Sequence, residues 1–228
     1  MPAAGRMLAD GVRLHLHHGP IDLILWADPA ARSAAYARAA GRFATVLDEL
    51  VAELPDLRSP DPPPLSGTVA RRMQAATAPF LPEFVTPMAA VAGAVADEVL
   101  AAMAADPHLR KAYVNNGGDI ALHLAAGETL TAAMAGGRVA VAAADPWRGI
   151  ATSGWRGRSQ SLGIADAVTV LAHSAAAADA AATLIANAVD LPGHPAIRRR
   201  PAREIAPDSD LVDRPVTVAV GALTTAEA

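Results

Sequence analysis

The sequence of 228 residues contains no cysteine. Disulfide bonds, thiolate metal sites and cysteine nucleophiles are therefore excluded. Aromatic residues are also scarce, at 4%, although hydrophobic residues make up 52% of the chain. We therefore expect a core of alanine, valine, leucine and isoleucine, in which small side chains let the backbones pack closely.

The chain also lacks a strong positive charge and a clear membrane segment. Its formal net charge is −4, so nothing indicates a broad surface for nucleic acid. The first residues show no continuous apolar run of the signal-peptide kind. The apolar stretch 88–105 is long, but Asp97 and Glu98 interrupt it, which favours a buried helix over a membrane span. We expect a soluble, cytoplasmic protein without nucleic-acid or membrane partners.

Hydrophobic periodicity predicts a mixed α+β fold rather than a regular succession of βαβ units. Residues 12–27 alternate on both sides of a Gly19-Pro20 turn and predict a hairpin. The proline-rich stretch 55–67 is interpreted as a loop inside a single domain, 1–228, although such loops also separate lobes. Helices are expected at 30–54, 86–105 and 175–189, and strands at 112–115, 119–124, 138–145, 168–172 and 214–223.

A polar, glycine-rich interruption, "NNGGD" at 115–119, separates two apolar runs. Asn-Gly at such a position is typical of a hairpin turn, because both residues tolerate a positive φ. The alternative is that the bare glycine backbone leaves room for a ligand. The local pattern alone favours the turn.

Three polar residues of the helix expected at 175–189 are spaced four residues apart: Asp179, Thr183 and Asn187. They lie on one helix face, and their oxygens are hard ligands that suit Mg²⁺. The alternative is a stripe that faces solvent. Small apolar residues cover the other faces of the helix, which indicates burial on several sides and requires a partner for the carboxylate.

The stretch 149–166, "GIATSGWRGRSQSLGIAD", combines glycines, hydroxyls and arginines. It is neither a Walker loop nor a nucleophile elbow. Bare backbone amides, hydroxyls and guanidinium groups are what a phosphate-binding loop uses, and we favour this interpretation over a solvated loop. Trp155 is placed to stack on a planar ligand. The candidate ligand-binding residues are Thr152, Ser153, Gly154, Arg158, Ser159 and Ser161.

Two further clusters are assigned to the surface. His15, His17 and His18 have no additional ligand nearby in sequence, so an exposed sheet face is favoured over a metal site. The stretch 197–204, "IRRRPARE", is interpreted as a solvated basic turn rather than a docking site for a nucleotide phosphate.

Four segments occur in an order that resembles a widespread uncharacterised prokaryotic family: "TPMAAVAGAVADEV", "VNNGGDIALHL", "GIATSGWRGRSQSLGIADAVTVLA" and "ADAAATLIANAV". The resemblance spans nearly the whole chain. That family is more remotely similar to the ApbE-type FAD:protein FMN transferases through three motifs, N-x-GGD, ATSG and A-D-x-x-x-T. The resemblance implies a two-lobed α+β fold with a mixed sheet, buried alanine-rich helices and a flavin cleft between the lobes.

The resemblance also implies roles for particular residues. Mg²⁺ would be held at the pyrophosphate by Asp179 and Thr183 and by a backbone carbonyl near Ala92 or Gly93. The glycine-rich segment would lie beside the bound FAD, or FMN, through Asn115, Asn116, Gly117, Gly118 and Asp119.

One segment departs from the transferase pattern. Those enzymes carry H-x-x-D-P-x-T-G after ATSG, whereas this chain has "WRGRSQSLGIAD", in which Asp166 is the only carboxylate. Asp166 and Asp179 are therefore the candidate catalytic residues, and the expected function is Mg²⁺-dependent FMN transfer from FAD or hydrolysis of FAD. The alternatives are a non-catalytic protein that binds a flavin or ring-phosphate compound, and an enzyme of cofactor metabolism with another substrate. Small-residue helices are compatible with a homodimer.

Overall fold

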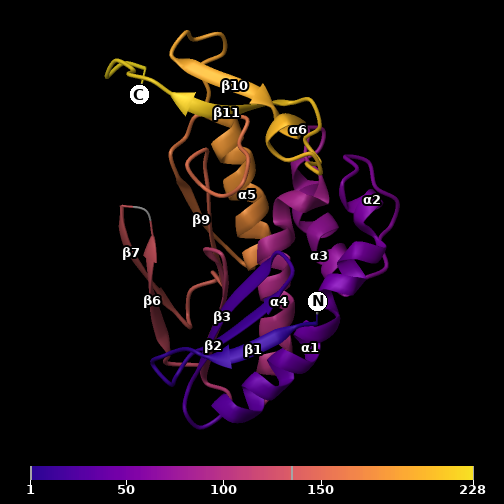
Figure 1. Ribbon diagram of the computed structural model, residues 1–228. Helices are drawn as coiled ribbons and strands as arrows, with labels where there is room; N and C mark the ends of the chain where they lie inside the picture. The colour runs from indigo at the N-terminus through magenta and orange to yellow at the C-terminus, as the bar shows by residue number, and fades with distance from the viewer. Residues whose placement is uncertain (1, 135, 228) are drawn as a thin grey trace.

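The computed structural model describes residues 2–134 and 136–227. Its largest element is a seven-stranded sheet with strand order β1-β2-β3-β4-β5-β8-β9 (Figure 1). The α+β class is confirmed, but each described pairing in this sheet is antiparallel, so the expectation of a mixed sheet is wrong. The strands are β1 (Ala4–Met7), β2 (Leu14–His18), β3 (Ile21–Ala27), β4 (Lys111–Asn116), β5 (Asp119–Leu124), β8 (Gly149–Ser153) and β9 (Val168–Ala172).

A long helical segment between β3 and β4, called the helical excursion below, connects these two neighbouring strands, which run antiparallel. Ala27, the last residue of β3, pairs with Ala112 near the start of β4. The intervening chain therefore leaves and re-enters the sheet at the same end, which makes the two strands antiparallel. The excursion contains α1 (Arg32–Ala52), α2 (Leu54–Leu57), α3 (Thr68–Thr77), the 3₁₀ turns η1 (Ala78–Phe80) and η2 (Pro87–Ala90), and α4 (Val91–Ala104).

Helix α5 (Ala175–Ala188) packs against α4, β8 and β9 at short distance. Two glycines allow this approach. A Cβ atom on Gly93 of α4 would lie 2.2 Å from the carbonyl oxygen of Ala175, and one on Gly149 of β8 would lie 2.1 Å from the carbonyl carbon of Ser174. Ser174 caps α5, because its hydroxyl accepts a hydrogen bond from a backbone N–H of the first turn.

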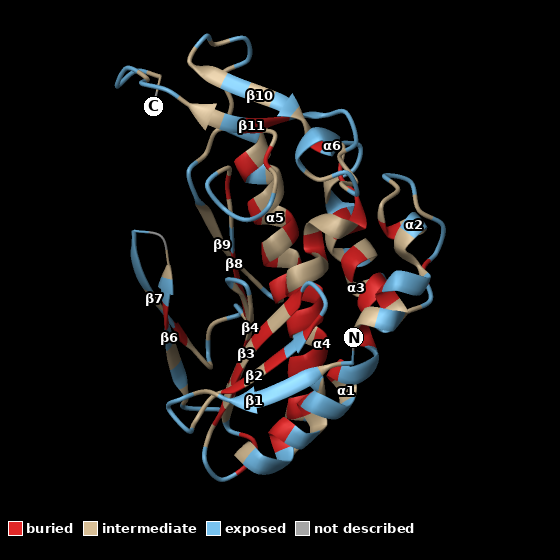
Figure 2. Ribbon diagram, viewed as in Figure 1, coloured by how far each residue is buried: buried red, intermediate tan, exposed pale blue. Residues whose placement is uncertain are grey.

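Helix α4 is a core helix, although Pro87–Ala104 is long and apolar enough to cross a membrane by length and composition. It packs against α1, α5, β4 and β5, and Figure 2 shows it largely buried. Its acidic residues find partners in neighbouring elements. Asp97 accepts hydrogen bonds from the first two backbone N–H groups of α5, and Glu98 pairs with Arg42 and Arg72.

A separate hairpin, β6 (Thr129–Met134) and β7 (Gly137–Ala142), packs on the main sheet. In Figure 1 it extends beside the sheet, away from α1. Sequence periodicity predicts its second strand only. The apolar residues buried between the hairpin and the sheet are Leu122, Leu124, Ala132, Val141 and Ile150.

The arginine-rich stretch near the C-terminus is a strand and not a solvated turn, so that prediction is wrong. Strand β10 (Ile197–Pro201) pairs with β11 (Pro215–Val220), and α6 (Ala202–Ile205) follows β10 directly. The Arg199 guanidinium forms an ion pair with Asp190. Backbone pairing with β11 defines this strand. Its three consecutive arginines show no apolar alternation, so the sequence pattern does not predict it.

The three N-terminal histidines occupy different environments. His15 Nε2 lies 3.0 Å from Asp22 Oδ2, and His17 is exposed, as expected for an open sheet face. His18 is buried and packs edge-on against Phe43, so the exposed-face interpretation is wrong for this residue. The two-residue period of β2 places His18 on the side that faces the helices.

Candidate functional site

Two adjoining cavities lie where α4, α5, the β4–β5 turn and the loop after β8 meet. The larger has a volume of about 820 Å³ and the smaller about 240 Å³. They share Met88, Val91, Ala92, Asp119 and Ser159 as lining residues. A cavity of several hundred Å³ with one apolar and one polar wall suits a small organic ligand.

The walls of the larger cavity differ in chemistry. The apolar wall consists of aliphatic residues from α1, α2, α4 and the start of β3, among them Ile21, Leu47, Val51, Leu54 and Val91. The opposite wall consists of polar and glycine residues predicted from the sequence: Asn116, Gly117, Asp119, Thr152, Ser153, Gly154, Arg158 and Ser159.

The polar stripe of α5 faces the smaller cavity. Asp179, Thr183 and Asn187 line it together, so the stripe is not simply a solvated helix face. Asp119 also lines this cavity and therefore joins the glycine-rich segment to α5. The structure thus brings together two motifs that lie far apart in the sequence.

The "NNGGD" segment is a tight turn, as the local pattern predicts. Asn116 pairs with Asp119, and the two glycines between them have φ values of +65° and +122°. The Asn115 carboxamide oxygen accepts a hydrogen bond from the backbone N–H of Gly118 at 2.8 Å, and neither residue lines a cavity. Gly117, in contrast, lines the larger cavity.

The Asn116 side chain links this turn to α4. Its amide donates a hydrogen bond to the backbone carbonyl of Ala92 at 3.1 Å. Ala92 lines both cavities, so Asn116 positions the carbonyl that sequence resemblance assigns to a metal.

The stretch 149–163 is part strand and part loop, since its first five residues form β8. Gly154 follows with a φ of +154°, and a Cβ atom there would lie 2.5 Å from the carbonyl oxygen of Asp166. The loop residues 157–159 line the larger cavity. Ser161 does not: it is buried and its hydroxyl donates a hydrogen bond to Asn187.

Asp166 is placed outside both cavities. Its side chain is 63% exposed, pairs with Arg156 at 2.9 Å and accepts a hydrogen bond from the Trp155 indole. The Arg156 guanidinium lies over the Trp155 ring, 5.3 Å from its centroid, and Trp155 lines neither cavity. The structure therefore does not bring Asp166 and Trp155 together with the other predicted site residues.

Asp119 and Asp179 form an acidic pair at the junction of the cavities. Burial raises the pKa of Asp119 from its usual 3.8 to about 6. Burial, followed by repulsion from the Asp119 carboxylate, raises the pKa of Asp179 well above its usual value. The backbone N–H of Thr152 donates to Asp119 and that of Gly93 donates to Asp179, and these hydrogen bonds offset the rise in pKa only in part. Such a pair attracts a cation.

The residues present fit Mg²⁺. Among the described residues no three His, Asp or Glu side chains gather as a metal cluster, so the donors at the Asp119–Asp179 pair are these two carboxylates and neutral oxygens. Mg²⁺ commonly uses one or two carboxylates and completes its shell with water and ligand phosphates. The candidate donors are Asp119, Asp179, the Thr183 hydroxyl and the Ala92 carbonyl.

Two charged lining residues, Arg58 and Asp210, were not predicted from the sequence. Arg58 lies at the end of α2 and lines the larger cavity. Asp210 lines the smaller cavity and accepts a hydrogen bond from the Thr86 hydroxyl at 2.5 Å. Thr86 therefore bonds to the C-terminal segment rather than capping its helix, and no local motif marks either cavity residue.

The raised pKa values predict an unusual pH dependence. The folded, metal-free protein retains protons that the unfolded chain releases above about pH 4, so its stability falls as the pH rises from 4 through 6 and above. Thermal unfolding in EDTA between pH 4 and 8 measures this. Asp119→Asn should flatten the profile, and adding Mg²⁺ should raise the unfolding temperature more at pH 8 than at pH 5. An unchanged slope in Asp119→Asn would contradict the assignment.

Comparison with known proteins places the chain in a family. The family model described as AbpE bacteria matches residues 5–228. A UPF0280 protein of Methanopyrus kandleri is 36% identical over 175 residues, covering 73% of this chain and 69% of that protein. A UPF0280 protein of Methanocaldococcus jannaschii is 41% identical over 113 residues, covering 46% of this chain and 45% of that protein. The chain therefore belongs to the AbpE bacteria family and is a relative of the UPF0280 proteins.

Proposed function

We propose that the chain is a Mg²⁺-dependent enzyme that acts on FAD at its pyrophosphate. The observation that supports this most is the Asp119–Asp179 pair at the junction of the two cavities. A divalent cation there would offset the repulsion between the carboxylates and would draw the phosphates of a dinucleotide to the same point.

The remaining residues have complementary roles in this proposal. The apolar wall accommodates a planar ring, and the polar wall donates hydrogen bonds to phosphate oxygens through Arg158, Ser153 and Ser159. Asn116 holds the Ala92 carbonyl toward the junction. Bound Mg²⁺ would supply Lewis-acid stabilisation of charge on the phosphates.

The reaction is cleavage of the pyrophosphate. A hydroxyl oxygen attacks the phosphorus on the FMN side, the bond to the bridging oxygen breaks, and AMP leaves with that oxygen. The acceptor hydroxyl belongs either to water, which gives FMN, or to a protein side chain, which gives a flavinylated protein. In both cases AMP is released, so one product reports on either outcome.

The second candidate is a flavin-binding protein without turnover. The described residues that line the two cavities include no histidine and no lysine. Histidine is the commonest proton-transfer residue of enzymes, so its absence from these linings favours binding over catalysis.

Incubation of the purified chain with FAD and Mg²⁺ separates the two candidates. We expect AMP to accumulate, measured by liquid chromatography, and to be lost in EDTA. Saturable FAD binding without AMP release would support the binding protein instead. If FAD neither binds nor is cleaved, both proposals fail.

A further inference from the structure

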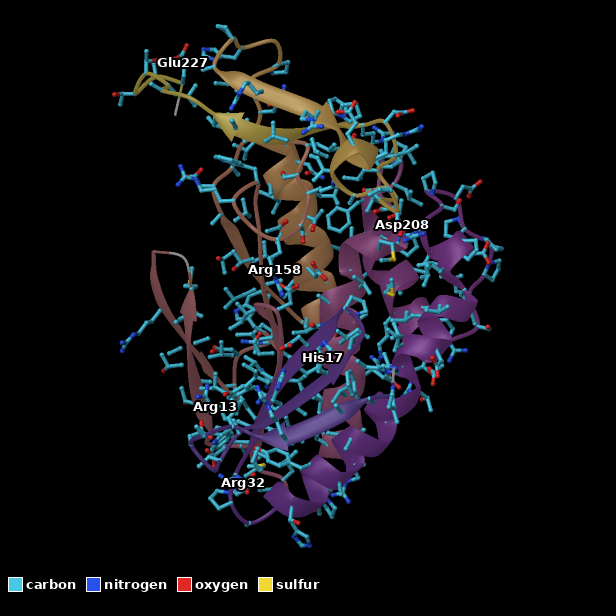
Figure 3. The ribbon with its side chains drawn as sticks, viewed as in Figure 1. Arg13, His17, Arg32, Arg158, Asp208 and Glu227 are labelled. Atoms are coloured by element: carbon cyan, nitrogen blue, oxygen red, sulfur yellow. The ribbon has the colours of Figure 1, made fainter. Side chains whose placement is uncertain are left out.

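The larger cavity contains two arginines that the metal site does not use. Arg58, at the end of α2, lines this cavity together with Leu54 and Leu57, and Arg158 lines it beside Gly117. Figure 3 shows Arg158 in the middle of the molecule. Neither guanidinium lines the smaller cavity.

These two guanidinium groups differ from most arginines of the chain. Arg38, Arg42 and Arg203, for example, pair with carboxylates at 2.5–2.8 Å. In the described part of the chain neither Arg58 nor Arg158 has a side-chain hydrogen bond or ion pair; Arg58 is half-buried and Arg158 is exposed. An arginine provides five N–H donors, and two such groups in one cavity provide strong positive charge for an anionic ligand.

The position of Arg58 is fixed by the fold. The Glu53 carboxylate accepts hydrogen bonds from the backbone N–H groups of Ser66 and Gly67 at 2.7 and 2.9 Å, which closes the proline-rich segment. Leu57, the neighbour of Arg58, is fully buried. Arg58 is therefore presented to the cavity by an anchored segment.

The position of Arg158 depends on a missing side chain. Its Nη2 atom lies 1.9 Å from the place that a Cβ atom on Gly117 would take. Any larger residue at 117 would displace the guanidinium. Gly118 also has a positive φ, but a Cβ atom there would meet nothing within 4 Å.

We propose that Arg58 and Arg158 form a metal-independent site for a terminal phosphate, so that the cavity accepts a planar ring compound that carries a phosphate monoester. This inference rests on the proposed use of the larger cavity for a ring ligand, and it names the class of that ligand. A monoester has three free oxygens, which match two guanidinium groups and the nearby hydroxyls of Ser153 and Ser159. The apolar wall accommodates the ring.

FMN and riboflavin test the proposal, because they differ only in the terminal phosphate. We expect FMN to bind about tenfold or more tightly than riboflavin in EDTA, measured by quenching of flavin fluorescence. Arg58→Ala and Arg158→Ala should each remove most of this preference and leave riboflavin affinity unchanged. Arg198→Ala removes an exposed arginine outside both cavities and serves as the matched control.

A glycine pair adds a second test that does not remove an arginine. Gly117→Ala should abolish the preference for FMN by displacing Arg158. Gly118→Ala should retain the preference, although its φ of +122° makes it the more strained of the two substitutions. Inorganic phosphate should compete with FMN and not with riboflavin.

Several results would overturn the proposal. These are equal affinities for the two flavins, no FMN binding at millimolar concentration, a preference that requires Mg²⁺, or a preference that survives Arg58→Ala. Inorganic phosphate that binds as tightly as FMN would exclude a role for the ring. A failure to detect AMP release from FAD would not contradict this phosphate site. The flavin-binding assay that tests the site contains no metal and requires no turnover.

Discussion

Asp179→Asn is expected to lower Mg²⁺-dependent AMP release from FAD by about a hundredfold or more. The substitution leaves Asp119 as the single carboxylate of the proposed metal site, and metal-assisted charge stabilisation contributes several kcal/mol. Asparagine keeps the size of the side chain and can still accept the hydrogen bond from the backbone N–H of Gly93. Initial rates of AMP formation across a Mg²⁺ titration measure the effect.

The same variant should be more stable than the native chain in EDTA at pH 8. Because the pKa of Asp179 is raised in the folded state, ionising this carboxyl group destabilises the fold, and a neutral amide avoids that cost. Asp48→Asn, which neutralises an exposed carboxylate on α1, is the control and should change neither quantity. AMP release that survives in Asp179→Asn would refute the metal site, and a lower unfolding temperature would refute the burial argument.

Gly93→Ala should produce a large loss of stability. Its new methyl group would lie 2.2 Å from the carbonyl oxygen of Ala175, and backbone atoms cannot rotate away as a side chain can. Helices α4 and α5 would have to separate. We expect a cost of about 3 kcal/mol, or roughly 6–12 °C in the unfolding temperature. Calorimetry or denaturant unfolding measures it.

Gly41→Ala is the matched control for this substitution. Gly41 lies within α1, it is exposed, and a Cβ atom there would meet nothing within 4 Å. Because alanine has the higher helix propensity, this variant should gain about 0.5–1 kcal/mol. A similar loss in both variants would show that the α4–α5 approach is not the cause.

The close approach of α5 also explains which strands the sequence could reveal. Strand β9, "VTVLA", is rich in β-branched residues and was predicted. Strand β8, "GIATS", was interpreted as loop, because it carries the small residues that leave room for α5. The small residues that β8 needs for this packing give it no apolar run like that of β9, so its sequence does not read as a strand. The local sequence pattern therefore did not predict β8, because its residue types are set by packing against α5, which is distant in the sequence.

A similar distinction applies to the candidate site. The helix period places Asp179, Thr183 and Asn187 on one face, so their common position was predictable. The glycine turn at 117–118 was predictable from its residues. Arg58 and Asp210 belong to segments without a recognisable period, and only the tertiary fold brings them to the cavities.

The helical excursion between β3 and β4 has a consequence for folding during synthesis. The pairing edge of β3 stays open until the chain has reached Asn116, because β4 is its only neighbour on that side in the described sheet. Residues 28–110 must be synthesised first, and during this time they must not pair with the open edge of β3. Contacts so distant in sequence slow folding and expose an edge to aggregation. The nascent N-terminal hairpin therefore carries an unpaired strand edge until β4 has been synthesised.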